Sequence, residues 1–342
     1  MILIVTSKQD GHVEAVSNHL TAAGAPWIRV NIEDFATNVE IDVDPATGSG
    51  WLTVKDSRKA VNLQDVGAVW YRKPEPVDVK HFELDPAALE YVEAEFTEVI
   101  LGLYAILSHA YWINNPFTTR VAHRKLLQLK VASEVGFAVP HSLLTNRLES
   151  ALAFASGIKS DLAIKSLGAI SVTRDQIGCA IQYGIFTRRM TPAELSEFGD
   201  KICHMPTLFQ QFISKDSELR ITCVGEQVFA CRILTRTGDI TNDDYRFNTL
   251  NLEHKAIECP ELTGRIHAYM KALSLNFACF DFIVSTGGES VFLEANCNGQ
   301  WLWIERRTGL PIGRAIANEL LRHALMTGDS GSTPEDTPQV SR

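Results

Sequence analysis

Residues 276–303 read NFACFDFIVSTGGESVFLEANCNGQWLW, which is two apolar, β-rich runs on either side of Gly287-Gly288. A Gly-Gly pair is a favoured centre for a two-residue hairpin loop, so the pattern predicts a β-hairpin. With these glycines as the loop, Asp281 lies directly opposite Glu294, and Asn296 follows two residues further along the same face. The hairpin is therefore expected to bring two acids and one amide together.

The two opposed acids call for a cation. Directly opposed side chains of a hairpin lie roughly 4.5–5.5 Å apart at Cβ, and like charges there repel. Because Asp281 and Glu294 lie inside runs apolar enough to be buried, leaving both unpaired is costly. Asp, Glu and Asn offer oxygen ligands, which suit the hard ion Mg²⁺. The alternative interpretation is a strand-edge acid and a solvated surface acid.

Length, composition and charge exclude several classes of protein. A chain of 342 residues with 45% hydrophobic and 21% charged residues is typical of a soluble globular protein with two or three packed units. The formal net charge of −9 argues against nucleic acid as a partner. No apolar run is long enough for a membrane span, and the first residues lack the pattern of a signal peptide. We therefore expect a cytoplasmic protein without a membrane partner.

The common site motifs are also missing from the sequence. Seven cysteines without a C-x-x-C pair indicate reduced thiols rather than a disulfide framework or a zinc knuckle. Ten histidines form no H-x-x-x-H pattern. The sequence has no G-x-G-x-x-G after its first strand, no P-loop motif and no G-x-S-x-G. An ordinary dinucleotide binder, a P-loop enzyme and a serine hydrolase are thus excluded.

The opening third of the chain reads as a small α/β unit. Short apolar runs such as residues 1–6 alternate with helical stretches, and a long amphipathic helix is predicted over residues 86–109. Asn114-Asn115-Pro116 is turn chemistry and marks a boundary. Arg72 ends the strand over residues 67–72, where a cation either binds an anion or is simply solvated.

Several charged residues stand out in the remainder of the chain. Lys165 lies inside an apolar strand and needs an anionic partner or a route to water. A second hairpin, about Gly225-Glu226, places Arg220 and Arg232 on opposite faces, so one site is served easily by only one of them. The polar stretch 235–251 has the composition of an active-site loop, with Arg246 as its most distinctive cation.

Six segments resemble the graspetide synthetases, the microviridin-type peptide cyclases among the ATP-grasp ligases. They are VWYRKP, KLLQLKVASEVGFAVP, FQQFI, ELRITCVG, DDYR and FLEANCNGQWLWIE, of which the last is the most specific. The resemblance extends over nearly the whole chain up to the last helix. It implies a mixed α/β and α+β chain with the ATP-grasp fold, which holds ATP between two lobes without a P-loop. The implied division is a pre-ATP-grasp α/β domain (1–116), a central lid subdomain (117–206) and a C-terminal catalytic subdomain (207–326). Residues 327–342 are small, polar and proline-bearing, so we expect a disordered tail.

The same resemblance, taken position by position, implies roles for individual residues. Two lysines match the ATP-phosphate lysines, a four-residue hinge reads adenine through its backbone, and two arginines lie near the transferred phosphate or the acidic substrate. The expected site comprises catalytic Arg220 and Arg246; ATP-binding Lys125, Lys165, Gln210, Gln211, Phe212, Ile213 and Glu218; magnesium ligands Asp281, Glu294 and Asn296; and substrate-binding Arg72, Arg232, Asn298 and Gln300. Two positions depart from the pattern: Cys297 stands where proline is frequent and Tyr245 where tryptophan is frequent.

The resemblance implies an ATP- and Mg²⁺-dependent macrocyclase. Such an enzyme phosphorylates Asp or Glu side chains of a ribosomally made precursor peptide, with ADP as a product, and joins the acyl phosphate to Ser or Thr hydroxyls or to Lys amines. The expected partners are the leader and core of that peptide and a second copy of the chain, with residues 170–190 as the candidate leader surface or ATP lid. One alternative is an ATP-grasp ligase that adds a free amino acid or amine to a peptide or metabolite. Another is a non-catalytic ATP-binding regulatory protein.

Overall fold

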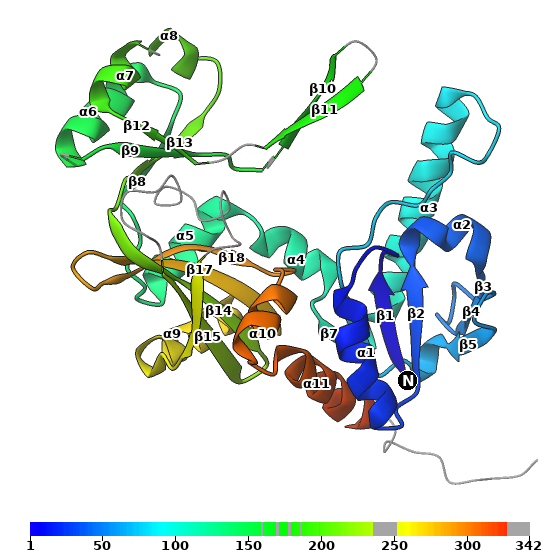
Figure 1. The fold of residues 1–342 in the computed structure, drawn as a ribbon. Helices are drawn as coiled ribbons and strands as arrows, with labels where there is room; N and C mark the ends of the chain where they lie inside the picture. The colour runs from blue at the N-terminus through cyan, green and yellow to red at the C-terminus, as the bar shows by residue number, and fades with distance from the viewer. Residues whose placement is uncertain are drawn as a thin grey trace, which may run out of the picture. The chain divides into compact units, whose positions relative to one another are not determined.

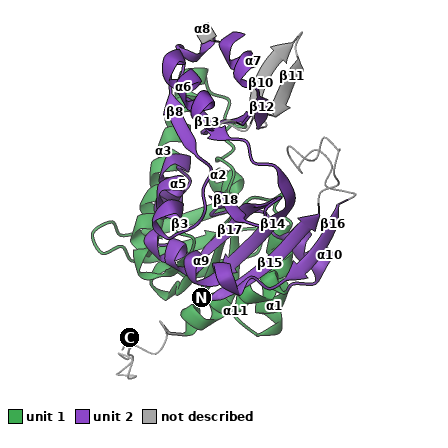
Figure 2. Cartoon of the chain, turned by 90° about the vertical axis from the view of Figure 1, so that its left-hand side faces the viewer, with its two compact units in different colours: residues 1–116, 311–342 green, residues 117–310 purple. Residues whose placement is uncertain are grey.

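The chain folds into two compact units (Figure 2). The computed structural model describes residues 1–158, 160–168, 171–176, 179–184, 187–197, 199–234 and 252–326. Unit 1 combines Met1–Pro116 with the segment that begins at Pro311, and unit 2 is Phe117–Leu310. Within the described ranges, every helix is too short or too polar to cross a membrane.

Unit 1 is built on a four-stranded parallel sheet of order β2-β1-β6-β7 (Figure 1). Strands β1, β6 and β7 are almost entirely apolar, as expected for a sheet covered on both faces, whereas in the edge strand β2 only Ile28 and Val30 are buried. A three-stranded antiparallel sheet, β3-β4-β5, contributes Leu52, Val54 and Val61 to the same core. The strands are β1 (Ile2–Thr6), β2 (Trp27–Asn31), β3 (Val39–Val43), β4 (Gly50–Val54), β5 (Lys59–Asn62), β6 (Ala68–Tyr71) and β7 (Tyr111–Ile113).

The α-helices described in this unit are α1 (His12–Ala22), α2 (Phe35–Asn38), α3 (Pro86–Ile106) and α11 (Ile312–Met326). The predicted long helix is confirmed as α3 followed by a short 3₁₀ turn, Leu107–His109. It begins where expected because Pro86 occupies its first turn and the Asp85 carboxylate accepts hydrogen bonds from two backbone N–H groups.

The last helix belongs to unit 1 rather than to the C-terminal part of the chain. The sequence placed residues 312–326 in the catalytic subdomain, but α11 packs against α1, β1, β6 and β7. Its apolar residues Ile312, Ile316 and Leu320 are fully buried there. The rest of the predicted division into subdomains stays a prediction.

The first part of unit 2 holds a four-stranded antiparallel sheet of order β12-β9-β13-β8. Helices α6, α7 and α8 accompany it, and residues such as Leu162, Leu195 and Phe209 form its small core. A separate antiparallel pair consists of β10 and β11. The elements are α4 (Pro116–Ala122), α5 (Lys125–Glu134), β8 (Ser142–Thr145), α6 (Leu148–Ile158), β9 (Leu162–Lys165), β10 (Ser171–Gln176), β11 (Cys179–Gly184), β12 (Arg188–Met190), α7 (Pro192–Glu197), α8 (Gly199–Ile202) and β13 (Thr207–Gln211).

The second part of unit 2 is a five-stranded antiparallel sheet of order β16-β15-β14-β17-β18. Helices α5 and α9 take part in its core, and α5 packs against the edge strand β18 (Figure 1). Aromatic rings dominate this core, where Phe137 stacks on Phe292 with ring centroids 5.7 Å apart. The elements are β14 (Lys215–Val224), β15 (Gln227–Leu234), β16 (Glu253–Ile257), α9 (Pro260–Ala272), β17 (Phe277–Ser285), β18 (Ser290–Asn296) and α10 (Leu302–Thr308).

The β17–β18 hairpin has the predicted pairing of Asp281 with Glu294 but not the predicted loop. The two-residue loop is wrong, because the strands end at Ser285 and Ser290, and Gly288 turns the chain with φ 84°. One extra residue then enters β18 as a β-bulge between Phe292 and Glu294. The longer loop shifts the pairing by one residue and the bulge shifts it back, so the two departures cancel at the acids.

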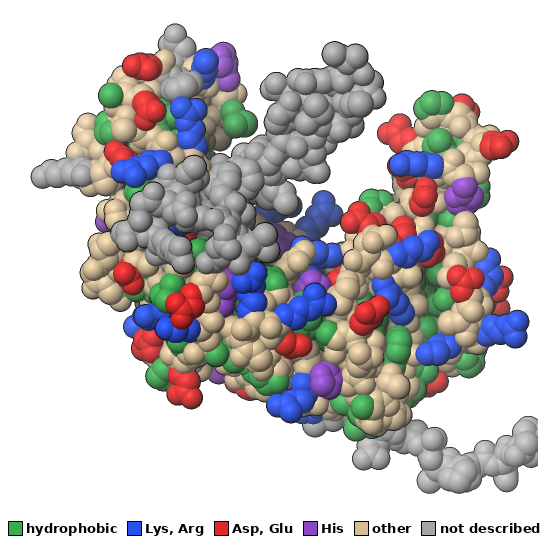
Figure 3. Space-filling view, in the orientation of Figure 1, with side chains coloured by type: hydrophobic (Ala, Val, Ile, Leu, Met, Phe, Trp, Pro, Cys, Tyr) green, Lys and Arg blue, Asp and Glu red, His purple; other side chains and the backbone are tan. Residues whose placement is uncertain are grey.

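Charged side chains are mixed over the face of the molecule shown in Figure 3. Lysine and arginine side chains as well as aspartate and glutamate side chains are spread over the coloured part of this face. The absence of a nucleic-acid partner stays a prediction from the net charge of −9.

Candidate active site

Arg220, Asp281 and Glu294 lie in a row across three neighbouring strands. Asp281 of β17 pairs with Arg220 of β14 on one side and with Glu294 of β18 on the other. Nη1 of Arg220 donates to both carboxylate oxygens of Asp281, at 2.6 and 2.8 Å, and Nη2 donates to the carbonyl oxygen of Gln300 at 3.0 Å. A guanidinium thus compensates the charge of Asp281 at the centre of the row.

Asn296 and Lys125 complete the group around the acids. The side-chain amide nitrogen of Asn296 lies 3.3 Å from an oxygen of Asp281 and 3.4 Å from an oxygen of Glu294. Nζ of Lys125 lies 3.7 Å from the other oxygen of Glu294 and donates to the carbonyl oxygen of Ser166 at 2.8 Å. Each acid therefore has a cation of the chain itself beside it.

The residues that converge here fit a magnesium ion. Among the described residues, no group of three or more His, Cys, Asp or Glu side chains is placed to hold a metal ion, but Asp281, Glu294 and Asn296 offer two carboxylates and an amide. Either end of an amide side chain can be turned toward its neighbours, so Asn296 can present its oxygen to a cation. Such an all-oxygen donor set matches the preference of Mg²⁺.

The two predicted lysines lie close together. Lys165 is the last residue of β9 and pairs in the sheet with Leu208 of β13. Nζ of Lys125 donates to the carbonyl of Ser166, the residue that follows Lys165, so the tip of the Lys125 side chain lies beside the end of β9. Binding of ATP phosphates by these two lysines stays a prediction.

The predicted adenine hinge continues β13. The backbone N–H groups of Gln211 and Phe212 donate to the carbonyls of His141 and Asp161, both at 2.8 Å. The Gln210 side chain is buried and its amide nitrogen donates to Ser142 Oγ at 2.9 Å. Recognition of adenine by this stretch would therefore use its carbonyl oxygens or the N–H of Ile213, since two of its amide protons are already bonded.

Comparison with known proteins identifies the fold of the chain. Residues 1–120 match the MvdD pre-ATP grasp domain family. Macrocyclase MdnC from Microcystis aeruginosa MRC, crystallised with its precursor peptide MdnA, is 28% identical, with a TM-score of 0.81 over 94% of this chain and 99% of that one. This chain has the ATP-grasp fold. The predicted fold and the predicted resemblance are therefore confirmed.

Two further solved structures are similar to this chain and support the ATP-grasp fold. A Chryseobacterium gregarium RiPP-associated ATP-grasp ligase, in complex with ADP and a leader and core peptide, is 26% identical, with a TM-score of 0.85 over 94% of this chain and 96% of that one. Macrocyclase MdnB from Microcystis aeruginosa MRC is 27% identical, with a TM-score of 0.74 over 94% of this chain and 98% of that one. No curated protein sequence matches the chain.

Glu218 and Arg232 lie on opposite faces of the five-stranded sheet. Glu218 shares a face of β14 with Arg220 and forms a buried ion pair with Lys215. Arg232 of β15 pairs with Leu219, which belongs to the apolar core, so the predicted opposition of the two arginines is confirmed. A role for Arg232 in binding substrate stays a prediction.

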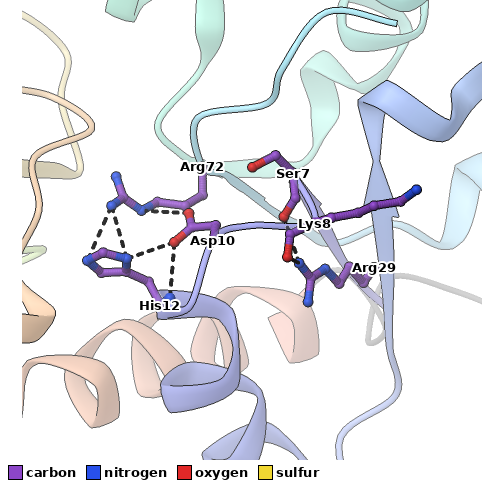
Figure 4. Close-up of polar contacts among 6 residues, drawn as sticks. All are labelled: Ser7, Lys8, Asp10, His12, Arg29 and Arg72. Carbon is purple, nitrogen blue, oxygen red and sulfur yellow. Dashed lines mark hydrogen bonds and ion pairs between the residues drawn. The ribbon is translucent and has the colours of Figure 1, made fainter. Parts of the chain in front are cut away.

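Arg72 belongs to unit 1, is buried, and contacts Asp10 and His12 (Figure 4). Its side chain is 2% exposed, its Nε lies 3.1 Å from Asp10 Oδ2, and its Nη2 lies 3.3 Å from each ring nitrogen of His12. The interpretation of Arg72 as a solvated strand end is therefore wrong, whereas a role in binding substrate stays a prediction. Arg29 fixes the same loop by donating to the carbonyl oxygen of Ser7 at 2.6 Å.

The Asp10–His12 pair has shifted pKa values. Burial raises the pKa of Asp10, but the hydrogen bond from His12 and the charge of Arg72 outweigh it, so the pKa lies below its usual value. Burial lowers the pKa of His12, and the charge of Arg72 adds to this effect against the opposing influence of Asp10. The cluster thus holds a carboxylate, a neutral imidazole and a guanidinium.

The loop after β18 packs closely on the acid row. A Cβ atom on Gly299 would lie 2.4 Å from Cβ of Cys279 and 3.0 Å from Nη2 of Arg220, so this position requires glycine. Cys297 is buried, and burial raises the pKa of its thiol to about 12. The sequence predicted roles for Asn298 and Gln300, and in the structure the Gln300 backbone carbonyl binds Arg220.

Some predicted residues lie outside the described part of the chain. Arg246 and Tyr245 fall in residues 235–251, and the predicted tail is residues 327–342. Most side chains of the candidate leader surface, residues 170–190, are likewise not described, although β10 and β11 form there.

Proposed function

We propose that this protein is an ATP-dependent ligase that closes rings in a ribosomally made precursor peptide. The single observation that carries the proposal is the row of Arg220, Asp281 and Glu294, with Lys125 and Asn296 beside it, in a chain similar over 94% of its length to a macrocyclase crystallised with its precursor peptide. The reaction proposed is phosphorylation of a peptide Asp or Glu side chain by ATP, followed by displacement of phosphate by a Ser or Thr hydroxyl or a Lys amine.

The chain supplies charge and position for this reaction. Lys125 and Lys165 would hold phosphate oxygens as point cations, and Asp281, Glu294 and Asn296 would hold Mg²⁺. When bound, the ion would supply neutralisation of the phosphate charge. Because phosphoryl transfer asks for little covalent chemistry from the protein, such positioning accounts for most of the expected rate.

Arg220 is proposed to act at a fixed place. Its two terminal nitrogens are bonded to Asp281 and to the Gln300 carbonyl, so its charge is held beside the predicted metal ligands. A positive charge fixed before the reaction stabilises negative charge that builds up as the phosphoryl group moves. Holding the peptide carboxylate then falls to a further cation, for which Arg246 stays the prediction.

The proposal includes partners. A precursor with a leader and a core would bind. Each ring closed would lower the peptide mass by one water, because one carboxylate oxygen leaves with the phosphate as ATP becomes ADP and phosphate. A second copy of the chain and a cytoplasmic location stay predictions from the sequence.

The test is the intact mass of acidic peptides rich in Ser, Thr, Asp and Glu after incubation with the protein, ATP and Mg²⁺. We expect the loss of whole waters with the wild type and with Glu289→Gln, an exposed change in the turn of the same hairpin. Glu294→Gln should abolish the losses. A gain of an amino-acid mass would instead favour the free-amine ligase, and ATP binding without any change in peptide mass would favour the regulatory protein.

A further inference from the structure

Strand β18 carries two predicted metal ligands at the edge of a sheet. In the part of the sheet that the structure describes, it is the outermost strand after β17, and its outer side makes a β-bridge only at Val291, with Ala138. Ala295 lies between Glu294 and Asn296, and its side chain is buried in the apolar core. The orientation of both ligands therefore depends on what holds the backbone at Ala295.

The side chain of Gln128 takes the place of the missing strand. Its Oε1 accepts a hydrogen bond from the Ala295 N–H at 3.2 Å, and its Nε2 donates to the Ala295 carbonyl at 2.8 Å. Nε2 donates a second bond, also 2.8 Å long, to the carbonyl of Ala122. Since the amide group offers two donors, both are used, and the residue is 3% exposed.

Gln128 also lies on the helix that carries the predicted phosphate lysine. Lys125 is the first residue of α5, and a residue three positions later occupies the same face of a helix. Lys125 reaches Glu294 at 3.7 Å while Gln128 binds the backbone of the next residue, Ala295. A second tie, from the Phe292 N–H to the Ala138 carbonyl at 2.8 Å, holds β18 further along.

We infer that Gln128 is a positioning residue, whose side-chain amide sets the spacing between Lys125 and the ligand pair Glu294 and Asn296. The bonds to Ala295 are independent of any activity, whereas the consequence for nucleotide binding rests on the proposed function. Removal of a hydrogen-bonded residue behind metal ligands typically costs about 10–100-fold in metal affinity or activity. We expect Gln128 variants to lie in that range.

The test uses two variants and a control on the same helix. Gln128→Met keeps the length of the side chain without its hydrogen bonds. Gln128→Glu keeps the shape and one acceptor but turns a carboxylate toward the Ala295 carbonyl. Glu134→Gln changes an exposed residue of α5 and serves as the control.

Two measurements separate a positioning role from a merely structural one. Hydrogen exchange of the peptide that contains Ala295 reports the hydrogen bonds between the Gln128 side chain and the Ala295 backbone. Calorimetric titration with ATP, with and without Mg²⁺, reports the magnesium-dependent part of nucleotide affinity. In both Gln128 variants we expect faster exchange at Ala295 and a fall of about tenfold or more in the gain of affinity due to Mg²⁺, with ATP binding in the absence of Mg²⁺ little changed. Glu134→Gln should match the wild type.

The outcomes distinguish the two proposals. Unchanged exchange at Ala295 in the variants, or faster exchange with an unchanged effect of Mg²⁺, would overturn the positioning role while leaving the proposed function standing. A wild type whose ATP affinity does not respond to Mg²⁺ would refute the proposed site, and the positioning role with it. If Gln128→Met does not fold, Gln128→Glu decides alone.

Discussion

Replacing Arg220 with methionine removes the partner of a largely buried carboxylate. Arg220 is 5% exposed and the side chain of Asp281 is 16% exposed, so the change leaves Asp281 with little access to water. Breaking a buried, hydrogen-bonded ion pair by removing one partner costs about 3–5 kcal/mol. Because Asn296 still contacts Asp281 and some water reaches it, we expect the lower end, about 3 kcal/mol, in the free energy of unfolding.

A double-mutant cycle isolates the pair from other effects of the change. Asp281→Asn removes the charge but keeps the shape. The double variant Arg220→Met/Asp281→Asn should lose about 2 kcal/mol less free energy of unfolding than the two single variants lose in sum. The assay is urea unfolding in magnesium-free buffer, followed by tryptophan fluorescence, since the buried Trp301 directly follows Gln300, whose carbonyl binds Arg220. Lys130→Met with Glu134→Gln, an exposed pair, should show a coupling below about 0.5 kcal/mol.

Magnesium adds a further expected difference. With Arg220 absent, Asp281 and Glu294 retain Lys125 as the nearby cation, so Mg²⁺ should stabilise Arg220→Met more than it stabilises the wild type. A loss below about 1 kcal/mol in Arg220→Met, or a coupling with Asp281 below about 0.5 kcal/mol, would refute the argument that this pair neutralises the acid row.

Three other predictions concern different parts of the chain. The pKa of His12 in the folded protein lies below 6.5, so the unfolded chain takes up this proton first as the pH falls. The free energy of unfolding should therefore decrease as the pH falls from about 7.5 through 6.5 toward that lower pKa. His12→Gln should flatten this dependence in urea titrations at several pH values. Phe137→Ala should lower the free energy of unfolding by about 3–5 kcal/mol, measured in the same way, because the ring is buried against Phe292, while no such loss is expected from Phe117→Ala at an exposed position. Iodoacetamide at pH 8 should modify the exposed Cys203 and spare Cys297, whose thiol has a pKa of about 12, and peptide mass mapping that found Cys297 labelled in the folded protein would contradict this.

The sequence was informative wherever a short periodicity determined the outcome. The alternation of a strand placed Asp281 opposite Glu294 and separated Arg220 from Arg232, and both results agree with the structure. The predicted two-residue loop of the β17–β18 hairpin was wrong, because a bulge that compensates for a longer loop has no clear signal in an apolar run such as residues 291–293. Periodicity fixes which face a residue takes more reliably than it fixes where a turn begins.

Contacts between distant segments were beyond the reach of the sequence. Gln128 reads as an ordinary helix residue, and nothing local indicates that it binds a backbone 167 positions away. Arg72 looked like a strand terminus because its partners, Asp10 and His12, follow a different strand. The last helix has an apolar face that fits any sheet, and only its packing assigns it to unit 1. Tertiary partners, rather than local propensity, determined these cases.

The return of α11 to unit 1 has a consequence for synthesis of the chain on the ribosome. Residues 1–116 emerge first, but the helix that covers α1, β1, β6 and β7 is made only after the whole of Phe117–Leu310. At about 5–20 residues per second, the ribosome needs roughly 10–40 s to make that intervening part. For this interval the nascent unit 1 leaves uncovered the apolar surface that Ile312, Ile316 and Leu320 later bury, so binding by a chaperone should be strongest before the final helix emerges.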